Sequence, residues 1–420
     1  MANTVLTMGL IAKRAVKVLE NNLVMANQVY RGYEDEYQKN VNGYKPGDTI
    51  TVRRPAEYGV RKGPVIKIQD SVEGSLQIKV DRQIGVDLNF SSKDLTLDIV
   101  DFSERFLDSA LISIAQQVDQ DVASLYADIP NWVGTPGAVL TNFDSFAAAT
   151  QRFDDTSISP EPRVGIVSPR DARGLQANLT GPQSVFAPSM VDDVYRTGML
   201  PPVDGVKLFK TQNTPIISTG TRTPTGGTLN GGQLQTTWLA TKDTNTMQLT
   251  FTNIGANATV KKGEVFTLGG VFDVNIRSKI ALPYLKNFVV MADGTADGAG
   301  NVVLTISPPI IPAGATPLES AYQNVSAVPA SNAPVTFFGA ASTSYNNNIV
   351  FNKNAFALVM VPLEKPQGGL AQCSRQSYKG VSVRLASFWD GINDNNIWRM
   401  DVLYGVKTVD PRQAVRLSGT

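Results

Sequence analysis

Histidine is absent from this sequence of 420 residues, and cysteine occurs once, at Cys373. Histidine is the only side chain that titrates near neutral pH without perturbation, and it is the commonest metal ligand. Its absence excludes histidine-dependent triads, histidine general bases and histidine-ligated zinc. A single cysteine excludes an intrachain disulfide and a cysteine-rich metal site. Together these absences argue against an enzyme and predict no cofactor.

Long apolar runs are also missing, since none approaches the roughly eighteen residues of a membrane-spanning helix. We therefore expect no membrane partner. The apolar stretch Val5–Ala12 has no basic region before it and matches a signal peptide poorly. The 38 basic residues almost cancel the 37 acidic ones, so net charge alone indicates no nucleic-acid partner. Phosphate-binding Gly-rich loops and the Gly-x-Ser-x-Gly elbow are absent as well.

What is present begins with a basic amphipathic segment. Apolar residues recur at helical spacing from Thr4 to about Val29, and Lys13, Arg14 and Lys17 lie on the other side. Two interpretations remain open. The three cations are a solvated helix face, or they are a docking face for an acidic partner or a neighbouring subunit.

Residues 41–97 read as an extended ribbon with too few apolar residues for a core of its own. Glycine and proline punctuate short predicted strands at Thr49–Arg53, Val65–Ile68, Leu76–Val80 and Val86–Phe90. Charges of both signs follow the ribbon and are candidate contacts between subunits: Arg53, Arg54, Arg61, Lys62, Asp70 and Glu73. Solvated protection of the strand edges explains them equally well.

A long helix is predicted next, from about Phe102 to Ala127. Phe102, Phe106, Ala110, Ile114, Val118, Val122 and Leu125 form one apolar stripe. Asp101 and Glu104 make an acidic variant of a capping box at its start. Pro130 disfavours helix in the residue before it, so the helix should end there.

The remaining chain alternates helix and strand before becoming strand-rich. Asp144 should cap a helix that reaches Phe153, and strands are expected at 164–167 and 206–209. Between about residues 221 and 345 six short strands predict a small β-barrel: 234–240, 247–252, 265–268, 272–276, 288–291 and 302–306. We expect part of 308–344 to be linker. Closing strands are expected at 355–362, 381–388 and 398–406, with 390–396 joining the last two as a hairpin.

The order of these parts resembles the tailed-bacteriophage major capsid (coat) proteins of the Hong Kong 97-type fold, in particular the podophage coat family with an inserted β-barrel domain. Local runs carry the resemblance as well: Asp193–Gly198, Val203–Val206, Asn213–Pro215, Met247–Val271, Leu403–Val406 and Arg412–Ala414. It implies an α+β fold of five parts. These are an N-terminal arm helix (1–40), an E-loop hairpin (41–98), a peripheral domain with the spine helix (99–130 and 381–420), an axial domain (131–220 and 346–380) and the inserted barrel (221–345).

The resemblance also implies a structural function. Copies would form hexamers and pentamers of an icosahedral shell around double-stranded DNA, in the virion, after assembly in the host cytoplasm. It implies a scaffolding protein and a portal protein as partners, allows decoration proteins, and makes Lys13, Arg14 and Lys17 candidate contacts to scaffold or DNA. Lys242 and Asp243 become candidate contacts between capsomers. Two alternatives are a cellular nanocompartment shell of the same fold and a β-rich glycan-binding phage tail protein.

Overall fold

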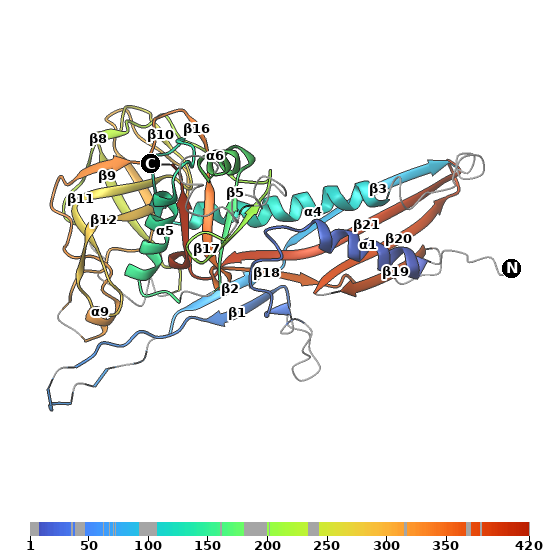
Figure 1. The fold of residues 1–420 in the computed structure, drawn as a ribbon, viewed down its shortest axis with the longest axis horizontal. Coiled ribbons are helices and arrows are strands. Elements are labelled where there is room, and N and C mark those ends of the chain that lie inside the picture. Colours follow the sequence, from blue (N-terminus) through green and yellow to red (C-terminus); the bar gives the residue numbers. More distant parts are fainter. Residues whose placement is uncertain are drawn as a thin grey trace. The chain divides into compact units, whose positions relative to one another are not determined.

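The structure is a computed structural model of the chain (Figure 1). It describes residues 8–34, 37, 47–61, 63–66, 68–69, 71, 73–91, 107–159, 162–179, 200, 202–233, 243–314, 317–366, 371–378 and 380–419. The chain divides into two compact units: Met1–Ile50, Gln77–Ala123 and Phe356–Lys407 form unit 1, and Thr51–Leu76, Ser124–Ala355 and Thr408–Thr420 form unit 2. The five-part division expected from the sequence is finer and stays a prediction.

Unit 1 is built on a five-stranded sheet. Its path is β18 (Phe356–Val361), β21 (Asn395–Thr408), β20 (Val381–Asp390) and β19 (Ala371–Tyr378), with β3 (Arg82–Ser91) also paired to β21. The ladder between β21 and β3 runs without a bulge from Asn395 opposite Ser91 to Tyr404 opposite Arg82. Helix α1 (Met8–Asn22) packs on β19 and β20, and helix α4 (Asp108–Ala123) contacts β3 (Figure 1). The sheet and these two helices enclose the core of the unit.

Helix α4 confirms the predicted apolar stripe and continues into the 3-10 helix η2 (Ser124–Asp128). The buried residues on this stripe include Ala110, Ile114, Val118 and Val122, and Leu107 and Leu111 beside it are buried as well. The predicted start of the helix, with its Asp101–Glu104 cap, lies outside the described residues.

The N-terminal helix α1 ends at Asn22, earlier than the predicted Val29. The carboxylate of Asp119, buried on α4, accepts hydrogen bonds from the backbone N–H of Val24 at 2.7 Å and of Ala26 at 2.9 Å. These N–H groups would otherwise continue the helix. The predicted helix is therefore too long at its end because a side chain of another helix takes its donors.

The ribbon forms β1 (Thr49–Arg53) and β2 (Ser75–Lys79), which pair with each other. The residues between them, 54–74, are called the arm below. The predicted strand at Val65–Ile68 is wrong for its described residues, which are not in a strand. Gly63 has a φ of 94°, Pro64 lacks a backbone donor, and the Arg61 guanidinium donates to the carbonyl oxygens of Gly63 and Val65. That geometry does not allow a regular ladder of strand hydrogen bonds at the described residues of this segment.

Unit 2 contains a second sheet, ordered β4 (Trp132–Val133), β22 (Ala414–Leu417), β17 (Asn348–Asn352), β5 (Arg163–Val167) and β6 (Val206–Lys210). Helices α5 (Phe143–Asp155) and α6 (Pro169–Leu179) share its core through Phe146, Phe153 and Leu175. The expected strands at 164–167 and 206–209 are confirmed as β5 and β6. Asp144 is not the cap of α5, because the N-cap position is Asn142 and Asp144 lies in the first turn.

The predicted small barrel is confirmed as a closed barrel of six strands, ordered β11-β12-β14-β9-β8-β15. Their bounds are β8 Thr225–Leu229, β9 Met247–Thr252, β11 Val265–Val274, β12 Ala281–Val290, β14 Val302–Ser307 and β15 Pro334–Phe337. The ring of Phe266 contacts those of Phe251, Phe288 and Phe337, with centroids 5.4 to 5.7 Å apart. A closed barrel leaves no unpaired sheet edge, which suits an inserted module.

The predicted strands of the barrel need three corrections. Those at 265–268 and 272–276 are one strand, β11, interrupted by register shifts. Strands β8 and β15 were not predicted, whereas the predicted strand at 234–240 lies outside the described residues. The segment 308–344 is no linker where it is described, because it supplies helix α9 (Pro317–Tyr322), strand β15 and the buried side chains of Ile310, Val325 and Val335.

Two further pairs of short strands belong to unit 2. Strand β10 (Thr259–Val260) pairs with β13 (Gly294–Thr295), and β7 (Ile216–Ser218) pairs with β16 (Ser344–Asn346). The β7–β16 pair brings together the two ends of the chain segment that contains the barrel. Entry to and exit from the barrel are thus held side by side.

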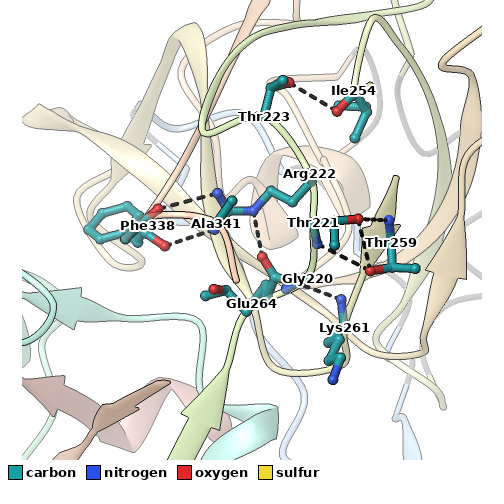
Figure 2. Close-up of polar contacts among 12 residues, drawn as sticks. Gly220, Thr221, Arg222, Thr223, Ile254, Thr259, Lys261, Glu264, Phe338 and Ala341 are labelled. Atoms are coloured by element: carbon teal, nitrogen blue, oxygen red, sulfur yellow. Dashed lines mark hydrogen bonds and ion pairs between the residues drawn. The ribbon is translucent and has the colours of Figure 1, made fainter. Parts of the chain in front are cut away.

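A buried ion pair lies beside the barrel, where Arg222 and Glu264 are both fully buried (Figure 2). The Arg222 guanidinium contacts the Glu264 carboxylate at 2.5 Å and donates to the carbonyl oxygens of Gly339 and Phe338. The other carboxylate oxygen of Glu264 accepts from the backbone N–H of Gly220 and Lys261, each at 2.8 Å. Nearly every polar group of the pair is satisfied, as a buried charge requires.

Arg416, on β22, is a second fully buried cation in unit 2. It donates to the carbonyl oxygen of Gly263 at 2.6 Å, and its guanidinium lies 5.2 Å from the ring of Tyr126 and 5.4 Å from that of Trp132. Burial lowers the pKa of Arg416 to about 10, so the side chain remains charged at neutral pH. This contact fastens the turn that carries Glu264 to the second sheet.

Candidate assembly surfaces

The arm is held to its own chain at its base. The Arg54 N–H donates to the Gly74 carbonyl at 2.8 Å, and the Glu57 N–H donates to the Tyr322 hydroxyl at 3.1 Å. The Glu57 carboxylate is also paired with Arg412 at 2.6 Å. Several independent contacts therefore fix where the arm leaves unit 2.

The tip of the arm is ordered by polar contacts while its apolar side chains face solvent. The Gln69 side chain bonds both the N–H and the C=O of Gly59, at 2.8 and 2.7 Å, and so replaces a backbone partner. Tyr58 and Ser71 share a hydrogen bond of 2.8 Å. The exposed fractions of Val60, Val65, Ile66 and Ile68 nevertheless lie between 74% and 92%. These exposed aliphatic groups make the arm tip a candidate interaction surface.

The structure pairs two of the predicted arm charges within the chain, since Arg53 contacts Glu73 at 3.2 Å on the surface. Such an exposed pair contributes little stability. Arg54 is more enclosed, and burial lowers its pKa. Arg61 is exposed at the tip. Lys62 and Asp70 lie outside the described residues. That these six charged residues of the ribbon contact another subunit stays a prediction.

The predicted contact near Lys242 and Asp243 is described only for Asp243. Its carboxylate accepts hydrogen bonds from the backbone N–H and the hydroxyl of Ser75, at 2.7 and 2.8 Å. Asp243 thus supports the start of β2 within one chain. Lys242 lies outside the described residues, and a contact of this loop with another capsomer stays a prediction.

The cations of α1 do not behave alike. Lys13 and Lys17 are exposed, and Arg14 contacts Asp108 of α4 at 2.9 Å. Arg14 therefore has a role inside unit 1 that the sequence did not reveal. Lys13 and Lys17 remain the better candidates for an electrostatic contact with a partner.

One exposed surface was missed by sequence reasoning, although the hairpin itself was predicted. Residues 388–394, called the hairpin turn below, comprise the end of β20 and the turn that leads to β21. They present Trp389 and Ile392, which are 62% and 92% exposed. Asp390 accepts from the Ile392 N–H at 3.0 Å and from the Asn393 amide at 2.7 Å, and Asp394 accepts from the Trp389 indole at 3.2 Å. A Trp and an Ile around an Asp/Asn-rich turn were the available signal.

Among the described residues, no group of three or more His, Cys, Asp or Glu could hold a metal ion. Within the same described parts of the chain, the helices are too short or too polar to span a bilayer. The exposed residues of the arm, α1 and the hairpin turn are candidate contact surfaces.

Comparison with known protein families identifies the family of this chain. The profile of a family described as "P22 coat protein - gene protein 5" matches residues 1–419. The chain therefore belongs to the P22 coat protein family. It is a tailed-phage major capsid protein with an α+β fold that contains a closed six-stranded barrel, and its role is structural rather than enzymatic.

Several solved structures are similar to this chain. A structure titled "Mycobacterium phage Che8" has a TM-score of 0.48 at 11% identity, covering 94% of this chain and 90% of that one. "Capsid structure of the Cyanophage P-SCSP1u" has a TM-score of 0.43 at 10% identity, with coverages of 89% and 84%. "CUS-3 coat protein I-domain" is 28% identical with a TM-score of 0.20, covering 27% of this chain and 96% of that one. A search of curated protein sequences found no match.

Proposed function

We propose that copies of this capsid protein form hexamers and pentamers that tile an icosahedral shell around double-stranded DNA. Assembly takes place in the host cytoplasm, with a scaffolding protein and a portal protein as partners and decoration proteins as a further class. Membership of a phage coat family supports the proposal. The observation that carries it is the arm, whose exposed apolar tip is suited to burial on a neighbouring copy.

The energetic argument follows from the tip. Burying a Val or Ile side chain contributes about 1.5–3 kcal/mol relative to leaving it exposed. Four such side chains, Val60, Val65, Ile66 and Ile68, are exposed on one ribbon. Because the base of the arm is already fixed, docking costs less conformational entropy than ordering a flexible loop. A repeated contact of this kind suits a shell in which every copy both gives and receives an arm.

The second surface is the exposed pair Lys13 and Lys17 on α1. In this proposal they contact an acidic face of the scaffolding protein or the packaged DNA, without sequence specificity. Exposed charges of this kind act over about 10 Å at 0.1 M salt and about 3 Å at 1 M. The contact is therefore salt-sensitive and reversible.

The test is electron microscopy of the expressed protein, compared with a variant lacking Gly59–Gly74. The parent should form closed shells, and the deletion variant should remain folded by circular dichroism but stay unassembled. A finer variant is Ile66→Asp, which changes one exposed side chain, with Ile280→Asp on the barrel surface as its matched control. Normal shells from the deletion variant would show that the arm is not an assembly element. Particles holding enzyme cargo, or glycan-binding trimers, would favour the two alternatives.

A further inference from the structure

The start of the arm is attached to the barrel through Glu57. Its backbone N–H donates to the hydroxyl of Tyr322 at 3.1 Å, and Tyr322 ends α9, which lies in the chain between barrel strands β14 and β15. Helix α9 is itself fixed to the turn between β11 and β12, because the Lys279 ammonium donates to the carbonyl oxygens of Ala321 at 2.6 Å and Gln323 at 3.3 Å. A continuous set of hydrogen bonds therefore runs from the barrel to the arm.

The end of the arm is attached to the same part of the chain through Ser75, the first residue of β2. Its N–H and its hydroxyl donate to the carboxylate of Asp243 at 2.7 and 2.8 Å, and Asp243 lies in the chain between barrel strands β8 and β9. The Arg54 N–H donates to the Gly74 carbonyl at 2.8 Å and joins the two stems of the arm. Both stems thus contact the segment from β8 to β15, called the barrel segment below.

Glu57 is also held by its side chain. Its carboxylate pairs with Arg412 of the 3-10 helix η5 (Pro411–Gln413) at 2.6 Å. The Asp410 carboxylate fixes the Arg412 guanidinium through contacts of 2.9 and 3.1 Å and raises the pKa of Arg412. Burial lowers the pKa of Lys279, and the negative charge of Glu57 opposes that shift. The backbone and the side chain of one arm residue are therefore bound by two different elements, α9 and η5.

We propose that the barrel segment is the mount of the arm, and that Tyr322 and Asp243 are positioning residues that fix the direction of the arm before a neighbouring copy arrives. Arg412 locks the same joint from the other side of Glu57. Where it concerns assembly, this inference rests on the proposed function. The barrel segment thereby acts within its own chain, by presenting a surface that lies outside the barrel.

The physical benefit is a lower entropy cost when copies join. An arm that pivoted freely would have to be ordered at every contact, whereas a fixed joint is ordered in advance. One hydrogen bond shifts a local opening equilibrium by about fivefold, and Glu57 has one at its backbone and a charged contact at its side chain. Both contacts are partly buried, unlike the exposed pair of Arg53 and Glu73, so solvent screens them less.

The mobility of the arm in the free chain tests the mount without any shell. A nitroxide attached to Val65→Cys, in a Cys373→Ser parent that has no other cysteine, reports the motion of the arm by electron paramagnetic resonance. Tyr322→Phe removes the acceptor of the Glu57 N–H, and Glu57→Gln removes the charge that pairs with Arg412. The double variant should mobilise the label more than either single variant. In Tyr322→Phe alone, amide hydrogen exchange at Glu57 should rise about fivefold.

Tyr345→Phe is the matched control for Tyr322→Phe. The Tyr345 hydroxyl also accepts a hydrogen bond from a backbone N–H, at 2.7 Å, but on β16. Both changes remove one contact of the same kind, so a general loss of stability would affect them alike, whereas only Tyr322→Phe should mobilise the label. Asp243→Ala tests the second stem, with Asp293→Ala as its control, because Asp293 also accepts from a backbone N–H at 2.7 Å.

The outcomes separate this inference from the proposed function. The double variant Tyr322→Phe with Glu57→Gln should form shells about fivefold more slowly than Tyr345→Phe. If its label stays as immobile as in the parent, or if Tyr345→Phe mobilises the label equally, the mount is wrong. Equal assembly rates of a chain with a loosened arm would overturn the role of the mount in assembly. If the parent forms no closed shells under any condition, the proposed function fails, whereas a loosened label in the free chain would still support the mount.

Discussion

Glu264 offers the strictest test of how the barrel is held together. In Glu264→Gln the retained amide oxygen can still accept from Gly220 and Lys261, but an amide N–H₂ faces Arg222. The guanidinium then lacks its countercharge in a site with no solvent exposure. Breaking a buried ion pair on one side costs about 3–5 kcal/mol, so we expect the free energy of unfolding to fall by that amount.

The double variant Arg222→Met with Glu264→Gln decides whether charge is the cause. It removes the buried cation but leaves the carbonyl oxygens of Phe338 and Gly339 without their donor. Each lost acceptor contact costs about 1 kcal/mol, so the double variant should lose about 2 kcal/mol. It should therefore be more stable than Glu264→Gln alone. Glu73→Gln is the matched control, because its partner Arg53 is 82% exposed and such pairs contribute at most about 1 kcal/mol.

Urea unfolding of the full chain, followed by circular dichroism, measures these differences. The chain has two compact units, so the transition that shifts with Glu264→Gln is assigned to unit 2. A Glu264→Gln chain as stable as the parent would refute the ion-pair reasoning. So would a double variant less stable than the single one.

Three further predictions concern unit 1. Ile114→Asp should lower the free energy of unfolding by about 4 kcal/mol or more and leave no soluble protein. Ile112 is 39% exposed on the same helix, so Ile112→Asp should keep the free energy of unfolding within about 1 kcal/mol of the parent's. Burial raises the pKa of Asp119, so its contribution to stability is present below its ordinary pKa and is lost as pH rises through the raised value. The Tm of the parent should therefore fall relative to the Tm of Asp119→Asn as the pH rises from 4 to 7, and a constant difference would contradict this. Replacing Lys13 and Lys17 by Ser should slow scaffold-dependent assembly at low salt with unchanged Tm, and equal rates would leave both residues as a solvated face.

Strong periodicity made parts of the fold predictable. The stripe through Ala110, Ile114 and Val118 predicted α4, and the alternation in residues 247–252 predicted β9 with its observed bounds. Strand β8 was missed because Thr225–Leu229 contains two glycines, so its strand character depends on pairing with β15 and β9 rather than on its own residues. Strand β15 was missed for a similar reason, since it lies among Pro, Ala, Ser and Asn. Tertiary pairing overrode local propensity at both positions.

The assembly surfaces were less predictable than the fold. The sequence located the arm, but it did not show that Arg14 pairs with Asp108 or that Asp243 supports Ser75. These contacts join residues far apart in the chain, and no local pattern encodes them. The hairpin turn was predicted as a loop, yet its role as a surface became visible only when the exposure of Ile392 was known.

The position of β22 within the second sheet has a consequence for the order of events during synthesis. Residues 414–417 lie between β4 and β17, so Trp132 pairs with a residue far later in the chain. Every other strand of that sheet leaves the ribosome earlier, and β4 and β17 have an open gap between them until β22 arrives. The barrel has all six of its strands by then, whereas its fastening through Arg416 does not yet exist. A nascent chain at that stage has every strand of the barrel but an unfinished second sheet, and a stalled or truncated product would expose that gap to other chains.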